Sequence, residues 1–453
     1  MKSRKLALEI LLEISRGGYS NLVLDKYLKR VKDARDRALV TEMVYGILRL
    51  KNRLDYIIKQ FASIPIKKMD AAVLQALRMG VYQIFYLDRV PDRAAVHETV
   101  EAVKGLSNKG AAGFVNGVLR NISRKKDKVF FPRPEKDGKT YLVDYLSHPE
   151  WLVDYWLGIY GFEKTRELCE YNNHPAGLVI RINSLKYSEE DFLQVFREAG
   201  IELIPSWLPG SYIVPDNRGV ENLPLYREGG FIVQGLSAAL VGHIMDPLPG
   251  MRLLDMAAAP GGKSTHLAEL MENQGEIIAL DIHEHKLKLI NSNCRRLGVE
   301  IVKTVNSDSR YFKSEQKFDM ILLDAPCSGL GLIREKPEIR WNKSLDDIKD
   351  LAALQLEMLE KGISLLKDGG VLVYSTCTLT REENQGNIAR LLELYPDKIE
   401  IQDINEDLKR LGLNDILETD EDGLLEIFPS ENRAEGFLVF CVEIFTICPL
   451  NTF

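Results

Sequence analysis

The sequence predicts a three-part protein: a helical bundle, a small α+β module and a doubly wound α/β domain. Apolar residues recur at three- and four-residue spacing through residues 3–124, as they do on helices that share a core. From residue 236 onward, apolar strands alternate with helical segments, which is typical of a parallel sheet covered on both faces. The chain has 453 residues, enough for about three domains of ordinary size.

Composition and cysteine usage exclude several classes of protein. No apolar run approaches the ~20 residues that a membrane span requires, and Glu9 and Glu13 interrupt the apolar start, so we do not read it as a signal peptide. The six cysteines include no CxxC pair, which argues against a zinc knuckle or a disulfide framework. We therefore expect a cytoplasmic protein with reduced thiols, no metal and no membrane partner.

Charge is distributed unevenly along the chain. Residues 1–130 contain 26 Lys and Arg against 13 Asp and Glu, whereas the remaining residues contain 33 against 53. A basic module favours contact with a polyanion, because clustered Lys and Arg neutralise phosphates. A helical domain with a solvated basic face explains the same charge equally well.

The domain boundaries follow these changes of pattern. We expect an all-α domain over residues 1–128 and a linker over 129–141, where the chain is charged, aperiodic and contains prolines. Residues 142–235 give two helical stretches, then strand, helix and strands, and the α/β domain takes 236–453. On the strand "LVIRIN", Arg181 and Asn183 could contact RNA or lie on a solvated face.

A glycine-rich turn follows the first strand of the α/β domain, in "LLDMAAAPGGKSTHLAEL". Glycine lets the backbone approach a ligand closely, and exposed amides at a helix start attract a negative group. The turn is not a P-loop, because position 257 is Ala where that motif requires Gly, and it does not match GxGxxG. The residues expected to contact a ligand here are Ala257, Ala258, Ala259, Pro260, Gly261, Gly262 and Lys263.

Acidic residues follow the next strands. Asp281 closes the second strand, where a carboxylate can accept hydrogen bonds from ribose hydroxyls. Asp308 follows the third, where it could meet an adenine amino group or cap a turn, and Asp324 closes the fourth. Together with the turn, these acids favour a nucleoside ligand. Without a phosphate loop, S-adenosyl-L-methionine is a better candidate than a nucleotide; Lys263 could steady its carboxylate, hold the substrate, or be a solvated lysine.

Two cysteines follow two strands. "DAPCSGLG" places Cys327 after the fourth strand, and "LVYSTCTL" places Cys377 after the fifth. The carboxyl ends of neighbouring parallel strands meet at one edge of a sheet, so both thiols can face one pocket. The other cysteines are read as small buried hydrophobes: Cys169, Cys294, Cys441 and Cys448.

These motifs together resemble a known family. "AAAPGGKSTH", "LLDAPCSGLG", "IRW" at 339–341 and "YSTCTL" followed by "EEN" are similar to the RNA cytosine-5 methyltransferases of the NOL1/NOP2/Sun family, in its RsmB/Sun (Fmu) branch. The run from "LALEILLEI" to "FVNGVLRNI" resembles a NusB-like RNA-binding domain, and 142–235 an RRM-like module. The resemblance implies a Rossmann-like, S-adenosylmethionine-dependent methyltransferase domain that forms 5-methylcytosine in 16S rRNA.

The resemblance also implies roles for the site residues. Carbon 5 of cytosine is too poor a nucleophile to take a methyl group until a thiolate adds at C6. In this family the "TC" cysteine, here Cys377, is the nucleophile, and the "PC" cysteine, here Cys327, assists release. Asp324, kept partly protonated near the base, could absorb the charge that develops at N3. Lys263 is a further catalytic candidate. The expected partner is 16S rRNA, free or in a partly assembled small subunit, bound by a monomer.

Some alternatives stay open. DNA cytosine-5 methyltransferases use the "PC" cysteine as nucleophile, so DNA or tRNA is a second substrate class, and a non-catalytic RNA-binding assembly factor is a third reading. Three positions depart from the family pattern: Ala257 stands where Cys is frequent, Gly235 stands where the Asp of "VQD" is usual, and Glu435 replaces the Asp of "DGFF". The departure at Gly235 puts in doubt a local contact at the start of the α/β domain.

Overall fold

The computed structural model describes residues 3–104, 106–107, 110–215, 219–396, 398–420, 423–432 and 434–444. The chain forms two compact units. Unit 1 contains Met1–Pro175 together with Ile333–Ser344, and unit 2 contains Ala176–Leu332 and Leu345–Phe453. None of the described helices is long and apolar enough to cross a membrane.

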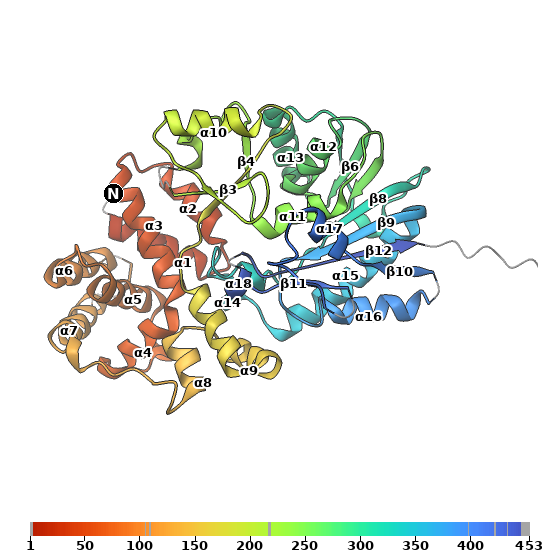
Figure 1. The fold of residues 1–453 in the computed structure, drawn as a ribbon. Helices are drawn as coiled ribbons and strands as arrows, with labels where there is room; N and C mark the ends of the chain where they lie inside the picture. Colours follow the sequence, from red (N-terminus) through yellow and green to blue (C-terminus); the bar gives the residue numbers. More distant parts are fainter. Residues whose placement is uncertain are drawn as a thin grey trace, which may run out of the picture. The chain divides into compact units, whose positions relative to one another are not determined.

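Seven helices build the first part of unit 1 (Figure 1): α1 Ser3–Ile14, α2 Ser20–Leu28, α3 Ala34–Arg49, α4 Lys51–Phe61, α5 Ala71–Tyr86, α6 Asp92–Val103 and α7 Ala111–Arg124. Asp33 and Asp70 accept hydrogen bonds from the first amides of α3 and α5, which fixes where these helices begin. Buried apolar residues from all seven helices share one core. Inside it, Arg78 donates to both carboxylate oxygens of Asp55 at 2.7 Å.

The rest of unit 1 includes a segment from the middle of the methyltransferase-like half of the sequence. The helices here are α8 Gly138–Thr140, η3 Tyr141–Tyr145, α9 Glu150–Asn172, which kinks at Gly161, and α14 Ile339–Asn342, with the short turns η1 Ile66–Lys68 and η2 Lys126–Lys128. The guanidinium group of Arg340 is fully buried and donates to the carbonyls of Ser147 and Asn172 at 3.0 and 3.1 Å. Ile333–Ser344 is therefore bound into unit 1 by backbone carbonyls, in a manner that the sequence pattern did not indicate.

Unit 2 begins with a four-stranded antiparallel sheet in the order β2-β3-β1-β4. Its elements are β1 Leu178–Ile182, α10 Glu189–Glu198, β2 Ile204–Pro205, β3 Ser211–Val214, η4 Val220–Asn222 and β4 Phe231–Val233. Phe192 and Phe196 on α10 pack against Phe231 in a buried aromatic cluster. The predicted small α+β fold is present in this part of unit 2.

Neither sequence interpretation of Arg181 and Asn183 was right, because both side chains are buried. Arg181 is only 3% exposed; its Nε donates to Gln234 at 2.7 Å and its Nη2 to Glu269 on the neighbouring helix at 3.1 Å. Asn183 donates to the carbonyls of Gly229 and Leu297, both at 2.8 Å. These polar groups join the small sheet to the α/β layer within unit 2.

The large sheet of unit 2 has the order β10-β12-β9-β8-β5-β6-β7, with β11 paired to β12 (Figure 1). Its strands are β5 Arg252–Asp255, β6 Glu276–Asp281, β7 Val302–Asn306, β8 Phe318–Asp324, β9 Leu366–Thr376, β10 Ile399–Gln402, β11 Leu425–Ile427 and β12 Phe437–Ile444. β7, β6, β5, β8 and β9 run parallel, and β12 is antiparallel to β9. From β5 the sheet is extended on one side by β6 and β7 and on the other side by β8 and β9, so the strand order reverses between β5 and β8. Doubly wound α/β sheets bind their ligands at such a reversal point.

Helices cover both faces of this sheet, and each face has its own apolar core. The helices are α11 Leu236–Met245, α12 Gly262–Leu270, α13 Glu284–Leu297, α15 Leu345–Leu365, α16 Gln385–Leu394, α17 Asn405–Arg410 and α18 Pro429–Asn432, with the turns η5 Ser309–Tyr311 and η6 Leu330–Leu332. Residues of α11, α12 and α13 belong to one core, and residues of α15 and α16 to the other. The predicted doubly wound α/β domain is confirmed.

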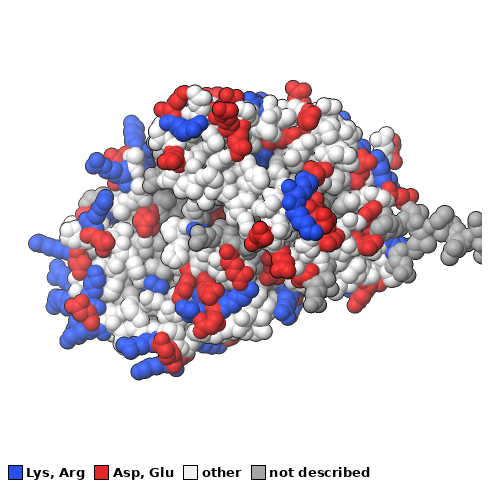
Figure 2. Space-filling model, viewed as in Figure 1, with Lys and Arg blue, Asp and Glu red and all other residues white. Residues whose placement is uncertain are grey.

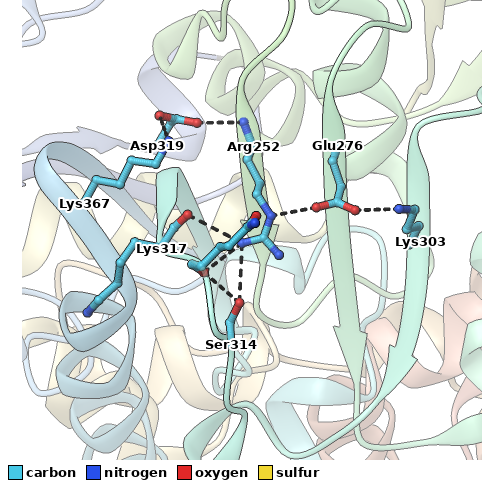
Figure 3. Close-up of polar contacts among 8 residues, drawn as sticks. Arg252, Glu276, Lys303, Ser314, Lys317, Asp319 and Lys367 are labelled. Carbon is cyan, nitrogen blue, oxygen red and sulfur yellow. Dashed lines mark hydrogen bonds and ion pairs between the residues drawn. The ribbon is translucent and has the colours of Figure 1, made fainter.

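Charged residues join the strands at the edge of the sheet where β5 and β6 begin (Figure 3). Arg252 contacts Glu276 at 2.6 Å, and Glu276 also accepts from Lys303 at 2.6 Å. The backbone amide of Arg252 donates to Asp319 at 2.8 Å, and Asp319 pairs with Lys367 at 2.5 Å. Three cations and two carboxylates thus pair at the amino ends of the strands. Asp281 and Asp324 lie at the opposite, carboxyl edge.

Candidate active site

A buried acid, Asp255, fixes the glycine-rich turn between β5 and α12. Asp255, at the end of β5, is 1% exposed and accepts a hydrogen bond from Ser264 Oγ at 2.6 Å. Burial raises the pKa of Asp255 to about 6, although the Ser264 hydroxyl opposes this shift. Because Ser264 lies in the first turn of α12, this contact ties the start of the helix to the strand.

The turn itself has the backbone shape of a ligand cradle. Gly261 has φ +98°, a conformation that residues with a side chain rarely adopt, and α12 begins at the next residue. A Cβ atom at Gly262 would meet nothing closer than 3.8 Å. Amides at a helix start attract a carboxylate such as that of S-adenosylmethionine, and a contact between this turn and the cofactor stays a prediction. The preceding residues, Ala257–Pro260, carry only small side chains.

Asp281 at the end of β6 is placed as the sequence predicts. Its Oδ1 accepts the amide of His283 at 2.8 Å, and among the described residues none is recorded as donating to Oδ2. Beside it, Ile282 is 59% exposed. A contact between Asp281 and ribose hydroxyls stays a prediction.

Asp308, after β7, is engaged within the protein. It accepts the backbone amide of Arg310 at 3.0 Å and forms an ion pair with the Arg310 guanidinium at 2.7 Å. Hydrogen bonds from Arg310 lower the pKa of the Asp308 carboxyl. These contacts match the turn-capping role that the sequence left open; a contact with adenine stays a prediction.

The two thiols meet because of the register between β8 and β9. Asp324 pairs with Ser375 in this parallel ladder, so the loops that follow the two strands start side by side. Cys327 Sγ lies 3.1 Å from Cys377 Sγ, and Gly331 N donates to the Cys377 carbonyl at 3.0 Å. The neighbouring Cys377 thiol, and then burial, raise the pKa of Cys327. The thiols thus form a hydrogen-bonded pair, in which the pKa of Cys327 is raised.

Lys263 and Asp324 connect the glycine-rich turn to the thiol loops. Lys263 Nζ lies 2.6 Å from Asp324 Oδ2, and Ser375 Oγ donates to Asp324 Oδ1 at 2.9 Å. The Lys263 ammonium group also sits 5.2 Å from the centre of the Phe437 ring. Four of the predicted site residues, Lys263, Asp324, Cys327 and Cys377, are therefore brought together at the carboxyl edge of the sheet.

Glu383, the second acid of "EEN", is a site residue to which the sequence analysis gave no role. Its carboxylate is fully buried and accepts hydrogen bonds from Ser328 N at 2.8 Å and Ser328 Oγ at 2.5 Å. Thr380 Oγ1 donates to it at 2.6 Å and Gln355 Nε2 at 2.9 Å. A buried charge with four hydrogen bonds beside two thiols is unusual enough to require an explanation.

The other described cysteines lie outside this thiol pair. Cys169, Cys294 and Cys441 are buried, as predicted, and burial raises the pKa of Cys294 to about 11. Cys448 lies outside the described residues. Within the described ranges, no group of three or more His, Cys, Asp or Glu residues could hold a metal ion.

The fold and this site define the chain as an S-adenosylmethionine-dependent methyltransferase. A Rossmann-like sheet carries a glycine-rich turn, the acid Asp281 and two thiols 3.1 Å apart, all at its carboxyl edge. The chain belongs to the RsmB/F family: a family model described as 16S rRNA methyltransferase RsmB/F matches residues 242–442. Models of the NusB family and of the ferredoxin-like domain of RsmF/B-like methyltransferases match residues 1–124 and 148–214.

Individual relatives agree with this assignment. A probable ribosomal RNA small subunit methyltransferase B from Bacillus subtilis is 39% identical, over 96% of this chain and 97% of its own length. A ribosomal RNA small subunit methyltransferase B from Klebsiella pneumoniae is 34% identical, over 87% of this chain and 90% of its own. The predicted family, fold class and cofactor are confirmed.

Solved structures show the same architecture. The crystal structure of the protein PH0851 is 27% identical and covers 98% of both chains with a TM-score of 0.81. A methyltransferase homolog from Pyrococcus horikoshii is 29% identical and covers 68% of this chain and 99% of its own, with a TM-score of 0.59. The domain boundaries at 128, 141 and 235 stay predictions, since the compact units divide the chain at 175 and take 333–344 into unit 1.

Proposed function

We propose that this protein forms 5-methylcytosine in 16S rRNA through a covalent adduct between Cys377 and C6 of the base. The observation that carries the proposal is the pair of thiols 3.1 Å apart, beside the Lys263–Asp324 ion pair. An activated thiolate next to a proton donor is what an addition to C6 of cytosine needs. Methyl transfer to an oxygen or an amino group would need neither thiol.

The proposed reaction begins with addition. The Cys377 thiolate attacks C6, so the C5–C6 double bond becomes a single bond and a new double bond forms between C4 and C5 as an enamine. The electron pair of the C4–N3 double bond moves to N3, which takes a proton from the Lys263–Asp324 pair. Asp324 Oδ2 and Lys263 Nζ are 2.6 Å apart, so the proton and the positive charge are already in place when charge develops at N3. When bound, S-adenosylmethionine supplies the methyl group that C5 accepts.

Release reverses the addition. The Cys327 thiolate removes the proton from C5, the bond between C6 and sulfur breaks, and Cys377 leaves as a thiolate. The proton at N3 returns to the Lys263–Asp324 pair, so the number of protons balances. The distance of 3.1 Å between the sulfur atoms supports this division of labour, since both can reach one base from one side. The opposite assignment, with Cys327 as nucleophile, is the alternative that the experiment must exclude.

The basic part of unit 1 supports RNA as the substrate. Figure 2 shows Lys and Arg side chains gathered over α6 and α7. The exposed basic residues on and around these helices include Arg89, Arg93, Lys104, Arg120, Arg124, Lys125 and Lys128. Clustered cations of this kind neutralise phosphates, and an RNA base must be splayed out of its structure before the thiol can reach it. We propose that the protein acts as a monomer in the cytoplasm, on free 16S rRNA or on a partly assembled small subunit.

Two cysteine variants test the roles of the thiols. With S-adenosylmethionine and 16S rRNA, Cys377→Ala should lose methyl transfer and form no adduct, whereas Cys327→Ala should accumulate an RNA adduct that survives a denaturing gel. Cys294→Ala, which removes a buried thiol on α13, is the matched control and should behave as the unaltered protein does. An adduct in Cys377→Ala would reverse the assignment.

Substrate class is tested with the unaltered protein. Methyl incorporation into 16S rRNA should exceed incorporation into tRNA and DNA, and mapping should find the product as 5-methylcytosine at one site in the head of the small subunit. Greater methyl incorporation into tRNA or DNA than into 16S rRNA would contradict the proposed substrate. Cofactor binding without turnover on any of the three polymers would instead support a non-catalytic assembly factor.

A further inference from the structure

Glu383 is a buried acid that contacts both thiol-bearing loops. It is 0% exposed, and its four hydrogen-bond donors are neutral groups from Ser328, Thr380 and Gln355. Taking a carboxylate out of water costs several kcal/mol unless hydrogen bonds replace its hydration. Four donors do so here, and because they are neutral, the negative charge itself is not cancelled.

The contacts of Glu383 join the residues that follow the two cysteines. Ser328 directly follows Cys327 and gives Glu383 both its amide and its hydroxyl group, at 2.8 and 2.5 Å. Ser328 Oγ also lies 2.7 Å from Oγ1 of Thr378, which directly follows Cys377. Thr380, from the same loop as Cys377, donates to Glu383 at 2.6 Å. One carboxylate thus fixes the backbone positions from which both sulfur atoms project.

Further contacts lock Glu383 itself. Gln355 on α15 donates to its Oε1 at 2.9 Å and to the carbonyl of Pro326 at 2.9 Å. The hydroxyl group of Tyr374 donates to the carbonyl of Glu383 at 2.7 Å. Since α15 and β9 are long, well-packed elements, the carboxylate has little freedom to move away from the thiols.

Fewer contacts separate the Glu383 carboxylate from Cys327 than from Cys377. Glu383 accepts the amide of Ser328, the residue bonded to Cys327, and it reaches Thr378 only through the Ser328 hydroxyl group. A nearby negative charge disfavours a thiolate. In agreement, the Glu383 carboxylate is among the causes that raise the pKa of Cys327, after the Cys377 hydrogen bond and burial.

We propose that Glu383 is a positioning residue that keeps the two thiols in contact and holds their shared proton on Cys327, so that Cys377 is the thiolate that attacks the base. In chemical terms, the pair loses one proton to solvent and exists as an S–H of Cys327 donating to the sulfur of Cys377. Once Cys377 is bonded to C6, its sulfur no longer carries the charge that opposed ionisation of Cys327. The Cys327 proton can then pass to water, and Cys327 becomes the base that the release step needs. The inference rests on the proposed function and deepens it.

The proposal is tested by alkylation of the full-length protein without RNA or cofactor. Iodoacetamide is applied in short pulses from pH 6 to pH 10, and mass spectrometry of peptides gives a separate rate for Cys327 and Cys377. In the unaltered protein, Cys377 should react about tenfold faster than Cys327 at pH 8, because alkylation requires the thiolate. Faster reaction of Cys327 would overturn the proposal without any variant.

Two variants separate charge from shape. Glu383→Gln keeps the size of the side chain and removes its charge, and should speed alkylation of Cys327 about tenfold at pH 8, so that the two rates converge. Ser328→Ala removes the hydroxyl bridge to Thr378 but leaves the amide contact, and should have the same effect in weaker form. Glu382→Gln, the neighbouring acid of "EEN", is the matched control and should leave the ratio of rates unchanged.

The outcomes distinguish this inference from the proposed function. If the far-UV circular dichroism of Glu383→Gln is unaltered and the ratio of rates stays as in the unaltered protein, the positioning role is wrong. If Glu383→Gln does not fold, Ser328→Ala decides by the same ratio. Because alkylation uses no RNA, a wrong substrate would leave these results intact. An unaltered ratio together with a trapped Cys377 adduct on 16S rRNA would reject only the role of Glu383.

Discussion

The carboxylate of Glu435 occupies the space that a Cβ atom at residue 235 would need. A Cβ built on Gly235 would lie 1.9 Å from Glu435 Oε1, and Glu435 Oε2 accepts the amide of Ser237 at 3.1 Å. Ser237 lies in the first turn of α11, so Glu435 caps a helix whose own cap residue, Gly235, has no side chain. The departures from the family pattern at Gly235 and Glu435 therefore lie at one contact, in which the acid at residue 435 caps α11.

This linkage predicts non-additive stability. Gly235→Asp alone should lower the free energy of unfolding by about 1–3 kcal/mol, because it places a side chain and a second negative charge where Glu435 lies. Gly235→Asp combined with Glu435→Asp, which shortens the acid, should recover most of that loss. Urea unfolding of the single and double variants measures the coupling. Additive effects would show that the two positions act independently.

The buried ion pair of Arg181 and Glu269 predicts a structural and not an RNA-binding role. Arg181→Met should lower the free energy of unfolding by about 3–5 kcal/mol, because it leaves the Glu269 carboxylate buried without its cation. Arg181→Met with Glu269→Gln should recover a large part of this loss. Thermal unfolding provides the measurement. A folded, fully stable Arg181→Met with weakened affinity for 16S rRNA would restore the RNA-contact interpretation.

The contrast between these residues and the thiols shows what the sequence could predict. Asp324, Cys327 and Cys377 were found because each follows an apolar strand, and parallel strands present their carboxyl ends at one edge. Arg181 looked exposed because its strand alternates polar and apolar residues. That α12 covers this strand, and supplies Glu269 as a partner, is a tertiary contact across 88 residues that no local pattern contains.

Glu383 and the segment 333–344 were missed for related reasons. An acid in a loop is ordinarily a solvated residue, and only the packing of α15 and β9 around Glu383 makes it buried. The segment 333–344 has a few helical residues but no signal of which core they join. Its attachment to unit 1 depends on the hydrogen bonds that Arg340 donates to backbone carbonyls of that unit.

Asp255 predicts a pH dependence of stability. Burial raises its pKa from 3.8 to about 6, so between these values the folded protein binds more protons at this site than the unfolded chain does. Its contribution to stability should therefore fall as pH rises from about 4 to about 6, by about 3 kcal/mol in total. Asp255→Asn should lack this loss, so its stability relative to the unaltered protein should grow over that interval. Urea unfolding at several pH values tests this, with Asp346→Asn, an exposed acid on α15, as the control. Parallel pH profiles for Asp255→Asn and the unaltered protein would contradict the prediction.

Lys263 connects the glycine-rich turn to Asp324, and under the proposed function its loss should impair methyl transfer without altering the reactivity of the thiols. Lys263→Met keeps the length of the side chain and its packing near Phe437 but removes the ammonium group 2.6 Å from Asp324. We expect methyl transfer in single-turnover assays to fall by about 10²–10³-fold, the typical cost of removing one preorganised group that stabilises developing charge.

Alkylation of Cys377 without RNA should change much less in the same variant, because no step at N3 is involved. Lys303→Met is a matched control: it removes an exposed ammonium group at the opposite edge of the sheet, where Lys303 pairs with Glu276 (Figure 3), and should leave methyl transfer intact. If Lys263→Met retained full methyl transfer, N3 would have to gain its proton from another donor, and the Lys263–Asp324 contact would serve only to join the turn to β8.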